Sequence, residues 1–158
     1  MTLPVRKRIR LENYDYSSEG YYFVTICAKN MRKVFGKINS PQTNTVQLSR
    51  IGKITEKQIQ SIGAHYSDIR IEKYVIMPNH IHMIIVLGCQ NTSRHQERPS
   101  LSSVVGLFKS GVSREIGMSI WQARFHDHVI RNEEAFLKIW NYIDTNPLLW
   151  EKDKFFVL

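Results

Sequence analysis

Two histidines in the middle of the chain, His80 and His82, have the residue type and the spacing of a metal-binding pair. They open an apolar run that continues to Leu87 and follows the turn formed by residues 77–79. Alternate side chains of an extended strand share one face, so both imidazoles would point the same way and could hold one metal ion. The same spacing also fits a structural or solvent-facing pair, and a metal would need a further donor from elsewhere in the chain.

Near the carboxyl end, Tyr142 does not fit the apolar pattern around it. Residues 133–145 are predicted to form a helix, with Asn132 as its cap and Pro147 as its stop. At roughly 100° per residue, Tyr142 lies about 110° from the centre of the apolar stripe. Asn146 falls one turn later on the same flank, so a hydroxyl and an amide oxygen would project together. An ordinary helix end before proline and a tyrosine with its hydroxyl in water explain the same pattern. The stripe itself consists of Phe136, Ile139, Trp140 and Ile143.

Hydrophobic periodicity predicts the elements that must position these residues. Strands are expected in five segments, namely 21–28, 34–38, 69–76, 80–87 and a short one within 121–130 that ends at Val129 and Ile130. Helices are expected in two further segments, namely 50–64, capped by Ser49, and 101–116. We expect 34–38 to pair with 21–28 as a hairpin across the polar turn 29–32, and we expect loops at 39–46 and 88–99.

This order of strands and helices predicts an α+β fold. Specifically, we expect a ferredoxin-like antiparallel sheet with helices packed on one face, plus the C-terminal helix that bears Tyr142. The chain of 158 residues fits one domain, 1–158, with a basic N-terminal arm, 1–20, within it.

Charge and composition favour a nucleic-acid partner. Twenty-two Lys and Arg against 14 Asp and Glu give a net charge of +8. This balance favours a polyanion, and basic residues interleaved with aromatics place nucleic acid ahead of an anionic membrane surface. The chain has neither a signal-peptide pattern nor an apolar run of membrane-spanning length, so we expect no membrane partner. Cys27 and Cys89 lack metal-ligand spacing and are expected to be buried free thiols, which predicts a reducing, cytoplasmic setting.

Several segments together resemble the IS200-type single-tyrosine (Y1, HUH) transposases, and most closely their REP-associated branch. The pairing of Pro-Asn-His-hydrophobe-His with a distant Tyr-Ile-x-x-Asn-Pro is specific, and the likeness runs in order over most of the chain. The residues that carry it are Arg8–Leu11, Tyr21–Cys27, Val75–His82, Phe108–Ser110, Trp121–Gln122, Val129–Glu134 and Tyr142–Pro147.

The resemblance implies roles for the residues singled out above. His80 and His82 match the family's metal-binding histidines, Tyr142 its nucleophile, and Asn146 its third metal ligand. It implies Mg²⁺ or Mn²⁺ as cofactor and single-stranded DNA with a hairpin, a REP-like or transposon end, as substrate in the bacterial nucleoid. Many members are dimers with the tyrosine helix supplied by the partner, whereas REP-associated relatives can act as monomers, so both a monomer and a homodimer remain open.

The expected activity is that of a metal-dependent single-stranded DNA endonuclease and strand transferase. Tyr142 would attack phosphorus, release a 3′-hydroxyl and form a 5′-phosphotyrosine that a later 3′-hydroxyl can attack. Two alternatives remain open, a non-catalytic module that binds hairpin or single-stranded DNA and a metal-dependent hydrolase that uses water.

Basic and aromatic residues elsewhere are candidates for contacts with DNA. Candidate phosphate contacts are Arg6, Lys7, Arg8, Arg10, Arg32, Lys33 and Lys109, and candidate stacking residues are Tyr14, Tyr16 and Trp121. A second alternating pair, His126 and His128, lacks the Pro-Asn context, and we expect it to be structural or to face DNA rather than to bind a competing metal.

Overall fold

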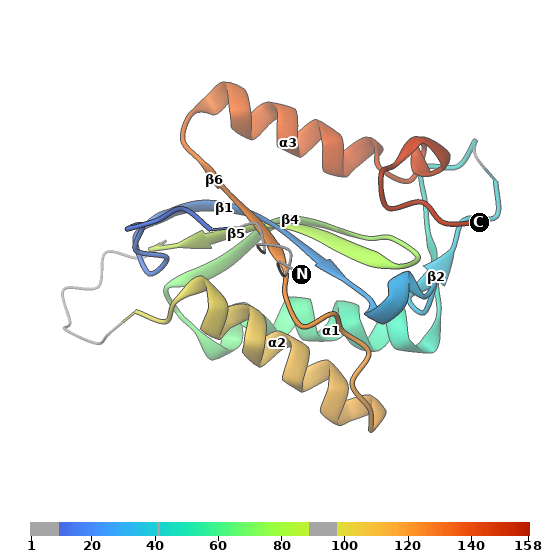
Figure 1. Cartoon of the computed structure of the whole chain (residues 1–158), viewed down its shortest axis with the longest axis horizontal. Helices are drawn as coiled ribbons and strands as arrows, with labels where there is room; N and C mark the ends of the chain where they lie inside the picture. Colours follow the sequence, from blue (N-terminus) through green and yellow to red (C-terminus); the bar gives the residue numbers. More distant parts are fainter. Residues whose placement is uncertain (1–9, 41, 89–97) are drawn as a thin grey trace, which may run out of the picture.

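A four-stranded antiparallel sheet in the order β4-β5-β1-β6 forms the centre of the molecule (Figure 1). The computed structural model describes residues 10–40, 42–88 and 98–158. The strands are β1 (Gly20–Cys27), β4 (Ile69–Ile76), β5 (His80–Leu87) and β6 (His126–Ile130). With one helix between β1 and β4 and another between β5 and β6, this order is ferredoxin-like, as predicted.

Helices cover both faces of this sheet (Figure 1). α1 (Arg50–His65) and α2 (Leu101–Ile116) lie together on one face, whereas α3 (Glu133–Thr145) crosses the other. The side chains of Ser49 and Asn132 accept hydrogen bonds from backbone amides of the first turns of α1 and α3, so both predicted caps are confirmed.

β5 is the most enclosed strand of the sheet. All eight of its residues are buried, and it pairs along its length with β4 on one side and β1 on the other. Apart from the two histidines its sequence is apolar, which explains this position, because a strand covered by helices on both faces needs apolar side chains on both. The two histidines at its start are therefore carried by the best-supported strand of the fold.

The predicted hairpin between 34–38 and β1 is wrong. β2 (Gly36–Lys37) pairs instead with β3 (Gln47–Leu48) in a separate two-stranded sheet. After β1 the chain turns through the 3₁₀ segment η1 (Lys29–Met31), and the Phe35 amide then donates to the Pro78 carbonyl at 3.0 Å. Because this contact directs the chain onto the turn before β5, residues 34–38 never run back along β1.

α3 is fixed across the sheet by an apolar contact and a charged one. Ile143 packs with Ile84 of β5 and Ile130 of β6. From β4, the ammonium of Lys73 lies 2.7 Å from a carboxylate oxygen of Asp144 and 4.2 Å from the centre of the Trp140 ring. These contacts determine which side of α3 faces the histidines, and therefore where Tyr142 lies.

Gly52, at the start of α1, provides a test of how tightly the helix joins the rest of the fold. A Cβ atom here would overlap the backbone carbonyl oxygen of Phe35. We expect Gly52→Ala to lower the free energy of unfolding by about 3 kcal/mol, because neither backbone can move away freely. In the matched change Gly106→Ala, within α2, the Cβ would meet no atom within 4 Å. Because alanine favours a helix more than glycine does, we expect the free energy of unfolding to rise by about 1 kcal/mol. Urea unfolding followed by circular dichroism measures the free energy of unfolding of both variants. If Gly52→Ala and Gly106→Ala changed it by similar amounts, the close contact between Gly52 and Phe35 would be contradicted.

Two other expectations concern the cysteines and membranes. Cys27 is buried with a free thiol, as predicted. Cys89 lies outside the described residues. Among the helices of the described segments, none combines the length and the apolar character needed to cross a membrane.

Candidate metal and tyrosine site

His80 and His82 share one face of the sheet, as their alternation predicted, and α3 covers that face. Both side chains are fully buried, and their Nε2 atoms are 3.0 Å apart. Two lone pairs at this distance would repel, so one of the two nitrogens must carry a proton and donate it to the other. The imidazoles thus converge on a single point.

Each histidine is oriented by a partner at its other ring nitrogen. The Asn79 side chain donates to the Phe155 carbonyl at 2.8 Å, which turns its Oδ1 towards His80 Nδ1 at 2.7 Å. Because an amide oxygen only accepts, His80 Nδ1 carries the proton and its Nε2 presents a lone pair towards His82. Thr25 Oγ1 lies 2.8 Å from His82 Nδ1. Such outer contacts fix the ring orientation of metal-binding histidines.

Burial keeps both imidazoles neutral. It lowers the pKa of His80 from 6.5 to about 4, although the nearby Asp153 carboxylate opposes the shift. Burial, followed by repulsion from a charge on His80, lowers the pKa of His82 well below 6.5. Neutral imidazole is the form that binds metals. His80 Nε2 already presents its lone pair, and His82 Nε2 would present one once the His82 proton moves to Nδ1, beside Thr25 Oγ1.

Tyr142 reaches the histidines within the same chain. Its hydroxyl lies 3.3 Å from His82 Nε2, and its ring packs edge-on against Phe23 of β1, with ring centres 6.1 Å apart. The sequence left open whether the tyrosine helix meets the histidines of its own chain or of a partner. The geometry described here brings the three side chains together in one chain.

Asp153 completes the cluster, and the sequence did not predict it. Its Oδ2 accepts hydrogen bonds from Asn146 Nδ2 at 2.8 Å and from the Tyr142 hydroxyl at 3.3 Å. Within residues 10–40, 42–88 and 98–158, one group of three acidic, histidine or cysteine side chains could share a metal, namely His80, His82 and Asp153, with ligand atoms within 4.8 Å of one another.

Asn146 brings an oxygen whose hydrogen-bonding capacity is unused. The residue is 1% exposed, and its Oδ1 has no hydrogen-bond partner among the described residues. A buried amide oxygen without a partner costs free energy that a cation at the same place would recover. Two imidazoles, a carboxylate and an amide oxygen form a donor set that suits Mn²⁺ and similar divalent ions, so these residues fit a metal.

Burial and charge together act on the Tyr142 phenol. Burial, and then the negative charge of Asp153, raise the pKa of Tyr142 to about 12. The phenol is therefore protonated at neutral pH, and its use as a nucleophile requires a proton acceptor or a nearby cation. Asp153 is placed to be that acceptor.

The candidate DNA contacts have different surroundings. Arg32 and Lys33 are exposed near η1, where Lys33 lies over the Phe156 ring at 5.6 Å. Arg10 forms an ion pair with Asp127 at 3.5 Å, and Lys109 is partly buried, donating to the Gln122 carbonyl at 2.7 Å. Arg6, Lys7 and Arg8 lie outside the described residues.

Other candidates fall on both faces of the sheet. Trp121 is buried against Phe35 and Phe108, so it belongs to the core and cannot stack on bases. Tyr14 and Tyr16 pack against each other and against Tyr22, each partly buried. His126 pairs with Thr25 across the sheet and His128 with Phe23, which places both exposed histidines on the face that holds the site.

The chain is similar to known proteins in sequence and in fold. No family model matches the chain. A solved structure described as a REP-associated tyrosine transposase bound to a REP hairpin aligns with this chain with a TM-score of 0.64 and 22% sequence identity. The alignment covers 92% of this chain and 76% of the chain of that structure. A protein of Haemophilus influenzae described as uncharacterized is 37% identical over 172 residues, which cover 96% of this chain and 93% of that protein. The chain therefore belongs to the same family as the Haemophilus influenzae protein, and it has the fold of a single-tyrosine transposase.

Proposed function

We propose that this protein is a metal-dependent single-stranded DNA endonuclease and strand transferase of the transposase kind. The observation that supports this most directly is the position of the Tyr142 hydroxyl, 3.3 Å from His82 Nε2 and 3.3 Å from Asp153 Oδ2. A phenol beside a histidine pair and a carboxylate has both a means of losing its proton and a place for a cation next to the bond it would attack.

In the proposed reaction, Tyr142 Oη attacks the phosphorus of a DNA phosphodiester. The phenol proton passes to Asp153, and the bond between phosphorus and the 3′ oxygen breaks. The 3′ oxygen leaves and takes up a proton from water to become a 3′-hydroxyl, while the 5′-phosphate stays joined to the tyrosine. A free 3′-hydroxyl can later attack this ester and regenerate the phenol, so joining needs no ATP.

His80, His82 and Asn146 would hold the metal, Mg²⁺ or Mn²⁺, with the Asp153 carboxylate beside them. When bound, the ion would neutralise charge that develops on the phosphate during attack. The protein's own contribution is orientation, because Thr25 and Asn79 fix the two imidazole rings and α3 fixes the phenol.

The proposed substrate is single-stranded DNA that carries a hairpin. The net charge of +8 supports a nucleic-acid partner. The structural neighbour is described as bound to a REP hairpin, and we propose hairpin DNA for this chain by analogy with it. Binding to such DNA would hold the single strand beside Tyr142.

The proposal is tested by the polarity of covalent attachment. The protein is incubated with Mn²⁺ or Mg²⁺ and hairpin-bearing single-stranded DNA labelled on one side of the cut or on the other, and is then denatured. We expect the label on the 3′ side of the cut to remain on the protein and the label on the 5′ side to be released with a 3′-hydroxyl. Cleavage without attachment would favour a hydrolase, and binding without cleavage a DNA-binding module.

Asp153→Asn tests the proposed proton acceptor. Because asparagine keeps the shape but lacks the negative charge, we expect cleavage to fall by roughly 10²-fold, within the range typical of general base catalysis. Glu134→Gln is the matched control, since its carboxylate is also on α3 but pairs with Lys138 at 2.8 Å, with 78% of the side chain exposed. A single-turnover cleavage rate measures both variants. Equal rates for the parent and Asp153→Asn would exclude this role.

A further inference from the structure

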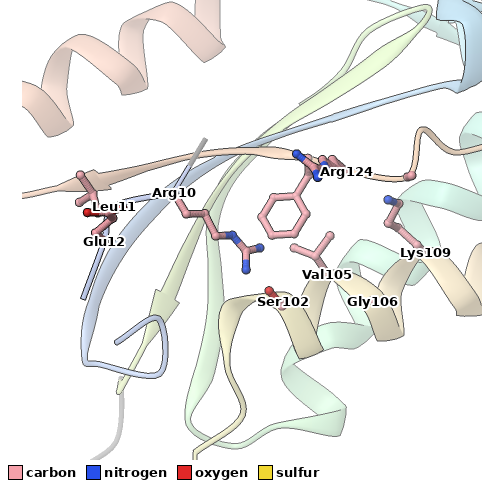
Figure 2. A pocket seen from close by; sticks show the side chains of 10 residues that line it. Arg10, Leu11, Glu12, Ser102, Val105, Gly106, Lys109 and Arg124 are labelled. Atoms are coloured by element: carbon pink, nitrogen blue, oxygen red, sulfur yellow. The ribbon is translucent and has the colours of Figure 1, made fainter. Parts of the chain in front are cut away.

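A cavity lies away from the tyrosine site, between α2 and the segment that leads into β6 (Figure 2). Its volume is about 670 Å³. Three basic residues from separate parts of the chain line it, namely Arg10 before β1, Lys109 on α2 and Arg124 before β6. Segments far apart in sequence therefore bring positive charge to one cavity.

The positive charge of this cavity is only partly neutralised. Among the described residues that line it, Glu12 is the one acidic residue, and Arg10 forms an ion pair with Asp127 at 3.5 Å. Lys109 Nζ donates one hydrogen bond, to the Gln122 carbonyl, although an ammonium has three N–H groups. Arg124 is exposed and has no ion pair or hydrogen bond within the described part of the chain. An anion in the cavity would thus find donors that are still available.

The cavity also offers an aromatic and apolar surface. Phe125 and Val105 contribute to its lining, and the Arg10 guanidinium lies 4.9 Å from the centre of the Phe125 ring. An aromatic ring beside basic side chains is the combination with which proteins hold unpaired nucleotides, because the base stacks and the phosphate is neutralised.

The position of the cavity relates it to the tyrosine site. Phe125 packs with the core between the sheet and the α1–α2 layer, whereas His126, the next residue, lies on the face that holds Tyr142. The cavity and the tyrosine are therefore on opposite faces of the sheet, separated by β6, which is an edge strand. A single strand that passes around this edge could contact both.

We infer that this cavity, formed by Arg10, Lys109, Arg124 and Phe125, is a subsite for an unpaired nucleotide of the bound DNA strand, away from the bond that is cut. This inference rests on the proposed function for its substrate class. The phosphate would lie between the three basic groups, and the base would lie against Phe125. The subsite would hold the strand without taking part in the chemistry.

Arg124→Ala is the first test, with affinity for labelled single-stranded oligonucleotide as the readout, in a Tyr142→Phe background without metal. We expect affinity to fall roughly three- to tenfold. The slope of the logarithm of the binding constant against the logarithm of salt concentration should become shallower by about 0.7, as for the loss of one phosphate contact. Arg114→Ala, an exposed arginine on α2 outside the cavity, is the matched control and should bind as the parent does.

Gly106→Leu is the second test and leaves the net charge unchanged. Gly106 lines the cavity and a Cβ there would meet no atom within 4 Å, so leucine would fill the cavity while favouring the helix. We expect weaker binding of single strands together with a thermal stability at or above that of the parent, because leucine favours the helix more than glycine does. The inference would be overturned if Arg124→Ala and Arg114→Ala lost the same affinity for single strands, or if neither Arg124→Ala nor Gly106→Leu lost any. It would also be overturned if the cavity variants lost as much affinity for blunt duplex DNA as for single strands. Binding is measured without cleavage, so failure of the proposed chemistry would be seen separately.

Discussion

Tyr142→Phe is expected to abolish the covalent protein–DNA adduct and to lower strand cleavage by more than about 10³-fold, as loss of a nucleophile usually does. The variant loses one oxygen and keeps the ring that packs against Phe23, so the fold should remain. The adduct is measured by denaturing electrophoresis after incubation with labelled DNA and Mn²⁺.

Tyr74→Phe is the control for this change. Tyr74 is also partly buried, and its hydroxyl donates to a carboxylate oxygen of Glu56 at 3.1 Å. We expect Tyr74→Phe to form adduct at the parental rate. If Tyr142→Phe still cut DNA, the attacking group would be water or another side chain, and Tyr142 would not be the nucleophile.

His82→Ala is expected to lower cleavage by about 10²- to 10³-fold and to weaken Mn²⁺ binding by at least about tenfold, because it removes one ligand of the proposed metal site. Treating the parent with a chelator should reproduce the loss of cleavage. Mn²⁺ binding, followed by electron paramagnetic resonance of the free ion, measures the metal site without reference to DNA.

His128→Ala provides the matched control. His128 lies on the same face of the sheet but is exposed and on the edge strand β6. Metal affinity in this variant should equal that of the parent. Comparable weakening in both variants would place the metal elsewhere, and full Mn²⁺ affinity in a folded His82→Ala protein would exclude the proposed ligand set.

Much of the fold could be predicted because its strands and helices carry strong local patterns. β4 and β5 begin and end at the predicted residues, and α3 ends before Pro147 as expected. The pairing of 34–38 was not predictable in this way. Its partner is decided by a contact between Phe35 and Pro78, which are 43 positions apart (78 − 35), and no short-range pattern encodes such a contact.

In the candidate site too, local patterns predicted some residues, whereas tertiary contacts decided others. His80 and His82 could be placed on one face from strand periodicity alone, and Tyr142 could be placed off the apolar stripe of its helix. Asp153 could not be found, because it follows the end of α3 in a stretch without periodicity. The chain turns through residues 146–149 and η2 (Trp150–Lys152) before the carboxylate returns to Asn146. Only this tertiary arrangement makes Asp153 a neighbour of Tyr142.

The position of the two histidines on β5 has a thermodynamic consequence. A mobile side chain loses rotational freedom when it binds a ligand, and that loss weakens binding. Both imidazoles are already held on a fully buried strand, each with a polar partner at Nδ1. Their conformational entropy is therefore lost when the protein folds. A metal ion that later enters would meet ligands that are already preorganised.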